Sequence, residues 1–164
     1  MQVAHRLPDY TETGGVGKMA YGATITEVCI PSNPDYLAWM RRIVGCLADC
    51  AGMDPSEVHD AKLAVTEACA NAIRHGSPHG ADDKVSIRIS SIKGSVVTEV
   101  TDAGAGFDPQ EINARPRTEP GGLGIPLMKA LTDDVQFEKN GAGMTVRLVK
   151  TAQQPRTRRY PFGR

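Results

Sequence analysis

The chain has 164 residues, of which 40% are hydrophobic and 23% are charged, as is typical of one globular domain. Nineteen basic residues balance nineteen acidic ones, so the net charge gives no indication of a nucleic-acid or anionic-membrane partner. No stretch approaches the roughly 20 apolar residues that a membrane-spanning helix needs, and the first residues lack an apolar signal segment. We therefore expect a cytoplasmic protein.

The two ends of the sequence differ from its middle. We expect residues 1–23 to form a flexible arm, residues 24–151 to form one folded domain, and residues 152–164 to form a basic tail. The tail has four arginines among its last nine residues, Arg156, Arg158, Arg159 and Arg164. Such a segment is most simply interpreted as a solvated, poorly ordered terminus.

The first half of the middle region predicts one strand and two helices. Residues 24–30 alternate and contain β-branched side chains, which indicates a strand. Apolar residues then recur at helical spacing from Leu37 until Gly52. A second helix is predicted to begin after Asp54, a typical N-cap residue, and to end at Gly76.

The second half predicts two hairpins, separated by a glycine- and proline-rich loop and a short helix over residues 125–131. Residues 85–92 and 95–101 form the first hairpin, and residues 135–138 and 144–149 form the second. Consecutive hairpins make a mixed, mostly antiparallel sheet, and the helices must cover one of its faces. The predicted fold is therefore an α+β, two-layer α/β sandwich.

Four cysteines lie in apolar stretches: Cys29, Cys46, Cys50 and Cys69. A reducing compartment would leave them as thiols. Cys46 and Cys50 are four residues apart on the first predicted helix, a spacing that matches no zinc pattern well. We interpret them as small, buried hydrophobic residues.

The second predicted helix carries a polar stripe. Glu67, Asn71 and His75 are spaced by four residues, so they share one face of the helix. The alanines beside the stripe, at positions 64, 68 and 72, would leave room for a ligand. Taken by itself, the stripe is equally consistent with a solvated helix face.

An acidic residue follows an apolar strand in the segment Asp102-Ala-Gly104-Ala-Gly106. Alternate glycines place the carboxylate where the backbone bends sharply and let a ligand approach the main chain. A tight turn capped by an aspartate is the alternative interpretation. A second glycine run, Gly121-Gly122-Leu123-Gly124, leads into the short helix, and the N-terminus of a helix favours phosphate. Many such runs serve only as hinges.

Together and in this order, these segments resemble the GHKL (Bergerat-fold) ATPase and kinase superfamily over residues 24–150. Glu67 and Asn71 look like its N box, the segment at Asp102 like its G1 box, and the run ending at Gly124 like its G2 box. Thr145 matches the threonine of the family's final strand. The sequence around Asn71 is similar to anti-sigma-factor serine/threonine kinases of the RsbW and SpoIIAB type.

This resemblance implies a site for ATP and Mg²⁺. It implies that Asp102 accepts a hydrogen bond from the adenine amino group, with support from Thr145, and that Asn71 is a ligand of Mg²⁺. Glu67 would be the catalytic base, and Arg115 or Arg117 could approach the γ-phosphate. The full set of implied cofactor-binding residues is Asn71, His75, Asp102, Gly104, Gly106, Gly121, Gly122, Leu123, Gly124 and Thr145.

The resemblance also implies an activity and partners. We expect an anti-sigma factor or partner-switching kinase that phosphorylates a STAS-domain antagonist, with a sigma factor as a further partner and a homodimer as a possible assembly. We expect no direct contact with nucleic acid or membrane. The alternatives are an ATP-binding switch that phosphorylates nothing and an ATP-gated interaction module split from a larger signalling protein.

Overall fold

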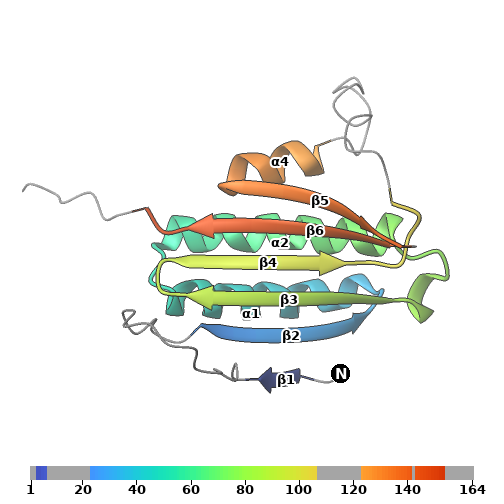
Figure 1. Ribbon diagram of the computed structural model, residues 1–164, viewed down its shortest axis with the longest axis horizontal. Helices are drawn as coiled ribbons and strands as arrows, with labels where there is room; N and C mark the ends of the chain where they lie inside the picture. The colour runs from blue at the N-terminus through green and yellow to red at the C-terminus, as the bar shows by residue number, and fades with distance from the viewer. Residues whose placement is uncertain (1–2, 7–22, 107–122, 142, 154–164) are drawn as a thin grey trace, which may run out of the picture.

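The computed structural model describes residues 3–6, 23–106, 123–141 and 143–153, and these residues form two layers (Figure 1). A six-stranded sheet in the order β1-β2-β3-β4-β6-β5 is covered on one face by helices. The strands are β1 (Val3–Arg6), β2 (Thr24–Pro31), β3 (Lys84–Ile92), β4 (Ser95–Thr101), β5 (Asp134–Asn140) and β6 (Gly143–Thr151). The helices are α1 (Leu37–Cys50), α2 (Pro55–His75) and α4 (Gly124–Leu131), with single turns η1 (Pro34–Tyr36) and η2 (Gly80–Asp82).

The predicted α+β sandwich is confirmed, but the sheet of the described residues is not mixed. Every pair of neighbouring strands in it is antiparallel. The helices α1 and α2 together connect β2 to β3, and α4 connects β4 to β5. Because α1 and α2 run in opposite directions, the chain returns to the end of β2 where it left the sheet, so β3 pairs antiparallel to β2.

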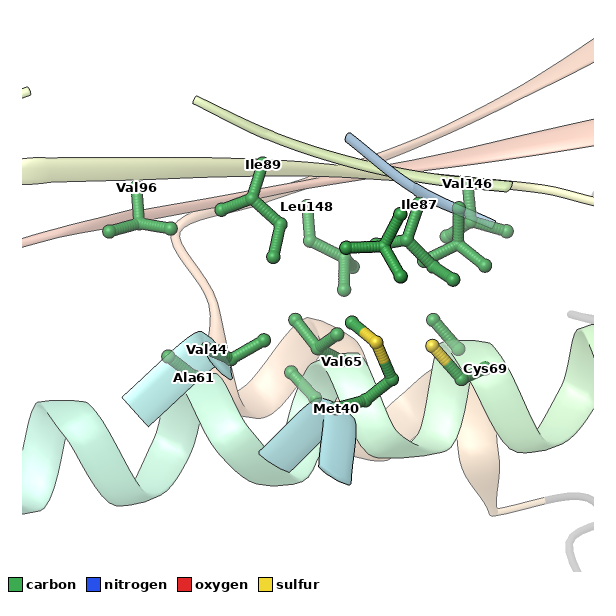
Figure 2. Close-up of a cluster of buried hydrophobic side chains, with 14 of the residues drawn as sticks. Met40, Val44, Ala61, Val65, Cys69, Ile87, Ile89, Val96, Val146 and Leu148 are labelled. Atoms are coloured by element: carbon green, nitrogen blue, oxygen red, sulfur yellow. The ribbon is translucent and has the colours of Figure 1, made fainter. Parts of the chain in front are cut away.

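The core lies between the sheet and the helices α1 and α2 (Figure 2). Side chains from β3, β4 and β6 point toward the two helices, and each fully buried valine or isoleucine stabilises the fold by about 1.5–3 kcal/mol. The alanines at positions 64, 68 and 72 belong to this core, where their small size lets α2 approach the sheet. The expectation that they leave room for a ligand is therefore wrong.

Helix α1 buries one side, formed by Met40, Val44 and Ala48 at every fourth position. Residues two positions further along point about 200° away, because a helix has 3.6 residues per turn. Cys46 and Cys50 stand at such positions and are both exposed, so the prediction that they are buried is wrong. The cysteines are free thiols, as expected.

Helix α2 begins at the predicted residue with a reciprocal cap. The Asp54 carboxylate accepts hydrogen bonds from the N–H groups of Ser56 and Glu57 at 2.8 and 2.9 Å, and Glu57 Oε2 accepts one from the Asp54 N–H at 2.8 Å. The bonds that the Asp54 carboxylate accepts, the one from the Glu57 N–H foremost, lower the pKa of Asp54. The second oxygen of Glu57 accepts the N–H of Gln153 at 2.6 Å, which fixes the end of β6 to the start of α2.

The structure also contains a strand that the sequence pattern does not predict. Residues Val3–Arg6 form β1 and pair antiparallel with β2, although residues 1–23 are expected to be an arm. Without β1, the outer edge of β2 would present unpaired backbone groups. The predicted arm and tail otherwise lie outside the described residues. Among the described helices, none is long and apolar enough to cross a bilayer.

Candidate nucleotide site

The polar stripe of α2 faces the beginning of α4. Glu67 and Asn71 are half-buried one turn apart, and His75 is the exposed last residue of the helix. A Cβ atom on Gly124 would lie 2.4 Å from Glu67 Oε1 and 3.0 Å from the Asn71 side-chain nitrogen. Only a glycine therefore lets the first turn of α4 approach these two side chains, and the fold brings the predicted N box and G2 box into contact.

The first turn of α4 has backbone donors that no described side chain accepts. Its N-cap residue, Leu123, makes no capping hydrogen bond with its side chain, which is 64% exposed. Within the described residues, no side chain accepts a hydrogen bond from the N–H groups of Gly124 and Ile125 at the positive end of the helix dipole, and Pro126 has no N–H. This arrangement suits an anion that lies against Gly124, close to Glu67 and Asn71.

Asp102 follows the last residue of β4 and is held through one oxygen. Its Oδ1 accepts the N–H of Gly104 at 3.0 Å and that of Met144 at 3.3 Å. The Asp102 N–H donates in turn to the Met144 carbonyl oxygen at 3.0 Å. No described residue donates a hydrogen bond to Oδ2, so this oxygen is available to accept one from a ligand.

The end of α2 packs directly against this carboxylate. A Cβ atom on Gly76 would lie 2.2 Å from the Asp102 Cγ atom, and the Gly76 carbonyl oxygen accepts the Ala103 N–H at 3.2 Å. On the other side, a Cβ atom on Gly143 would lie 2.0 Å from the Asp102 carbonyl oxygen. Two glycines distant in sequence thus let three backbone segments converge on Asp102.

We expect Gly76→Ala to weaken nucleotide binding at least tenfold, because the new methyl group must displace the Asp102 side chain from Oδ1 hydrogen bonds worth about 1 kcal/mol or more each. Isothermal titration with ATP measures the effect. Gly45→Ala, a glycine-to-alanine change in α1 that meets only the flexible Lys62 side chain, should keep the affinity of the parent protein. Equal affinities of all three proteins would contradict the role of Asp102.

Thr145 is not beside the Asp102 carboxylate. Its hydroxyl lies 2.8 Å from the Thr101 hydroxyl and accepts a hydrogen bond from the Asn140 side chain at 2.7 Å. Side chains of a strand alternate between the two faces, and Met144, Val146 and Leu148 are the buried set of β6. Thr145 consequently faces away from the helices, on the other side of the sheet from Asp102.

Met144 is the residue of β6 that lies next to Asp102, and the sequence patterns did not single it out. Its side chain is 2% exposed, and its Cε atom would be 3.5 Å from a Cβ atom on Gly106. The alternation along β6 could have identified Met144, because it is two residues from Val146 and therefore lies on the same, buried face of the strand. An apolar thioether at this position can contact the face of a planar base.

The remaining predicted site residues are only partly described. Gly104 packs against the end of α2, since a Cβ atom on it would lie 2.6 Å from the Gly76 Cα atom, and Gly106 has a φ of +70°. The exposed His75 side chain makes no hydrogen bond or ion pair within the described residues, so its cofactor-binding role stays a prediction. Gly121, Gly122, Arg115 and Arg117 lie outside the described residues.

The described residues fit a nucleotide–metal complex better than a metal ion alone. They contain no group of three or more His, Cys, Asp or Glu side chains that could hold a metal. Mg²⁺ commonly keeps several waters and is bound by one or two protein oxygens together with the phosphates of a nucleotide. The Asn71 amide oxygen, beside the backbone donors of α4, provides such a partial set.

Comparison with known proteins connects this geometry to a family. The family model described as a histidine kinase-like ATPase domain matches residues 30–150. The serine-protein kinase RsbW of Bacillus subtilis (strain 168) is 32% identical over 142 residues, which cover 80% of this chain and 88% of that protein. The serine-protein kinase RsbW of Bacillus pumilus is 31% identical over 144 residues, with the same coverage.

Two solved structures share the fold at low sequence identity. A crystal structure of RsbU and RsbW domains from Mycobacterium tuberculosis has a TM-score of 0.61 at 17% identity, covering 80% of this chain and 33% of that one. The SiaB–SiaC complex from Pseudomonas aeruginosa has a TM-score of 0.55 at 16% identity, covering 75% of this chain and 87% of the other. At these identities the likeness concerns the fold alone.

Proposed function

Because the chain belongs to the histidine kinase-like ATPase domain family, we propose that it is a serine/threonine protein kinase that uses Mg-ATP and controls a protein partner. The observation that carries this proposal is the contact of Gly124 with Glu67 and Asn71. It places a carboxylate, an amide and free helix N–H groups within one region. Phosphoryl transfer requires mainly positioning and charge neutralisation, and these groups can supply both.

Asp102 would select adenine. Its Oδ1 is occupied by backbone N–H groups, whereas Oδ2 is available to accept the adenine amino group. Guanine presents a carbonyl oxygen at the same position, which would leave the carboxylate facing an acceptor. Met144 would contact the base from the buried side, and Gly106 beside it would leave the necessary space.

The phosphates would lie at the start of α4. The free N–H groups of Gly124 and Ile125 would bind phosphate oxygens, and the Asn71 amide oxygen would hold Mg²⁺. Bound Mg²⁺ neutralises charge on the phosphates. Glu67 lies one helical turn before Asn71, where it can accept the proton of an attacking serine or threonine hydroxyl.

The partners are proposed from the relatives. The names of the Bacillus proteins support a kinase that acts on another protein. We assign this chain an anti-sigma or partner-switching role, with a STAS-domain antagonist as substrate and a sigma factor as second partner. A kinase of this kind acts where ATP and sigma factors are present, in the cytoplasm. A homodimer stays a prediction.

Labelled phosphate tests the proposal. The purified protein is incubated with γ-labelled Mg-ATP and a desalted lysate of the organism that encodes it, beside a lysate without the added protein. Acid-stable label on serine or threonine of a small protein, only when the kinase is added, is the expected result, and mass spectrometry then identifies the substrate. Binding of ATP without any transfer would instead support the alternative function, an ATP-binding switch that phosphorylates nothing.

A further inference from the structure

Helix α1 presents two thiols to solvent on one face. Cys46 and Cys50 are both exposed and are spaced by four residues, which places their Cβ atoms about 5–6 Å apart. The rest of the helix is anchored through the opposite side, where Met40, Val44 and Ala48 are buried. The pair is therefore accessible to small reagents without any opening of the core.

The chemical environments of the cysteines differ. Burial raises the pKa of Cys69 to about 12, so this thiol stays protonated and inert. The neighbouring charge of Cys46 is the largest cause that raises the pKa of Cys50. The charge of a thiolate at Cys46 therefore favours the protonated form of Cys50. A nucleophilic thiolate beside a protonated thiol is the arrangement needed to form a disulfide in two steps.

The backbone can supply the movement that a disulfide needs. A disulfide requires Cβ atoms about 3.5–4.5 Å apart, closer than two residues four apart on an undistorted helix. Cys50 is the last residue of α1, and the chain turns away just beyond it through Gly52, which has a φ of +84°. The last turn can therefore tighten or unwind while Met40 and Val44, which lie earlier in the helix, keep their packing.

We propose that Cys46 and Cys50 form an oxidant-sensitive thiol pair that hydrogen peroxide converts to an intrahelical disulfide. The Cys46 thiolate attacks one peroxide oxygen, the O–O bond breaks, and Cys46 becomes a sulfenic acid. The hydroxide released takes up the proton that the Cys46 thiol lost on ionisation and becomes water. The Cys50 sulfur then attacks the Cys46 sulfur, and the sulfenic oxygen leaves as water with the proton of Cys50. Two thiols are oxidised, one peroxide is reduced, and two waters form in total.

This modification acts at the end of the sheet opposite the nucleotide site (Figure 1). The end of α1 is joined to the β3–β4 turn, since the Gly94 N–H donates to the Ala51 carbonyl oxygen at 2.7 Å and the Ser91 hydroxyl donates to the Leu47 carbonyl oxygen at 3.2 Å. Tightening of the last turn strains these bonds. Asp102 lies beyond the other end of β4, so nucleotide binding does not depend on the state of the thiols.

Peptide mapping of the full-length protein tests the proposal. The protein is exposed to hydrogen peroxide, alkylated and digested with trypsin, which releases residues 43–62 as one peptide that contains both thiols. The expected product is an unalkylated peptide lighter by two hydrogens, which dithiothreitol restores to the alkylatable form. Cys69 should react at least about tenfold more slowly, because its thiol stays protonated.

Single substitutions distinguish the role of Cys46, which reacts with peroxide, from that of Cys50, which closes the disulfide. Cys50→Ser should let a sulfenic acid accumulate on Cys46, detected with dimedone, whereas Cys29→Ser, at a half-buried cysteine, should leave the disulfide unchanged. Faster hydrogen exchange at residues 47–53 in the oxidised protein is expected as well. A disulfide between two copies, equal oxidation of Cys69, or unchanged exchange after oxidation would each overturn the proposal. None of these readouts depends on kinase activity.

Discussion

Replacing Glu67 by glutamine is expected to lower phosphotransfer by about 10²–10⁴-fold while ATP affinity stays nearly unchanged. Glutamine keeps the size of the side chain, so the close contact with Gly124 can persist. It cannot accept the proton of the attacking hydroxyl, because a neutral amide is far less basic than a carboxylate. The loss should therefore appear in turnover and not in binding.

The measurement combines nucleotide titration with initial rates of label transfer to the identified substrate. Glu138→Gln, the same change at an exposed residue of β5, is the matched control and should keep both values. A variant at Glu67 with the parent rate would exclude this residue as the base. A variant that loses ATP binding as well would assign Glu67 to the nucleotide complex instead of proton transfer.

The order of the helices and strands was predictable from sequence patterns a few residues long. The start of α2 was predictable because its capping box is formed by residues three positions apart, and the structure contains both of its hydrogen bonds. The hairpin of β3 and β4 was predictable because alternation and the Lys93-Gly94 turn agree. Such patterns involve only residues close in sequence, so these elements can be predicted without knowledge of the tertiary contacts.

The predictions were wrong where contacts with residues distant in sequence determine the local structure. Strand β1 forms because β2 offers a free edge, and nothing within residues 3–6 specifies that pairing. The apolar composition around Cys46 and Cys50 suggested burial, but the orientation of α1 is set by Met40 and Val44 against the sheet. Composition alone therefore gave the wrong side of the helix.

Within the candidate site, the structure brings together some of the residues that the sequence motifs named and separates others. Glu67, Asn71 and Gly124 converge as the combination of motifs suggested, because α4 packs on α2. The hydroxyl of Thr145 is directed to the far face of the sheet, where it meets Thr101. Neighbouring residues of a strand point to opposite faces of the sheet. Matching the final strand to the family by its threonine therefore singled out Thr145 and overlooked Met144.

Replacing Asp102 by asparagine is expected to reduce ATP affinity by about 10–100-fold, since a charge-assisted hydrogen bond is worth about 1.5–3 kcal/mol. The asparagine oxygen can keep the two bonds from the N–H groups of Gly104 and Met144. Its amide nitrogen then takes the place of the free oxygen and donates where the carboxylate accepted. The adenine amino group is also a donor, so the two groups can no longer pair.

A change in base preference separates this mechanism from simple damage to the site. Inosine triphosphate carries a carbonyl oxygen in place of the adenine amino group, so the asparagine variant should bind it better relative to ATP than the parent does. Asp102→Ala should weaken ATP binding without that shift, because alanine has no donor. Thr145→Val, whose native hydroxyl contacts Thr101 and Asn140, should keep ATP affinity. If the asparagine variant kept the preference of the parent, Asp102 would not be the residue that reads the base, and the adenine would have to bind elsewhere in the site.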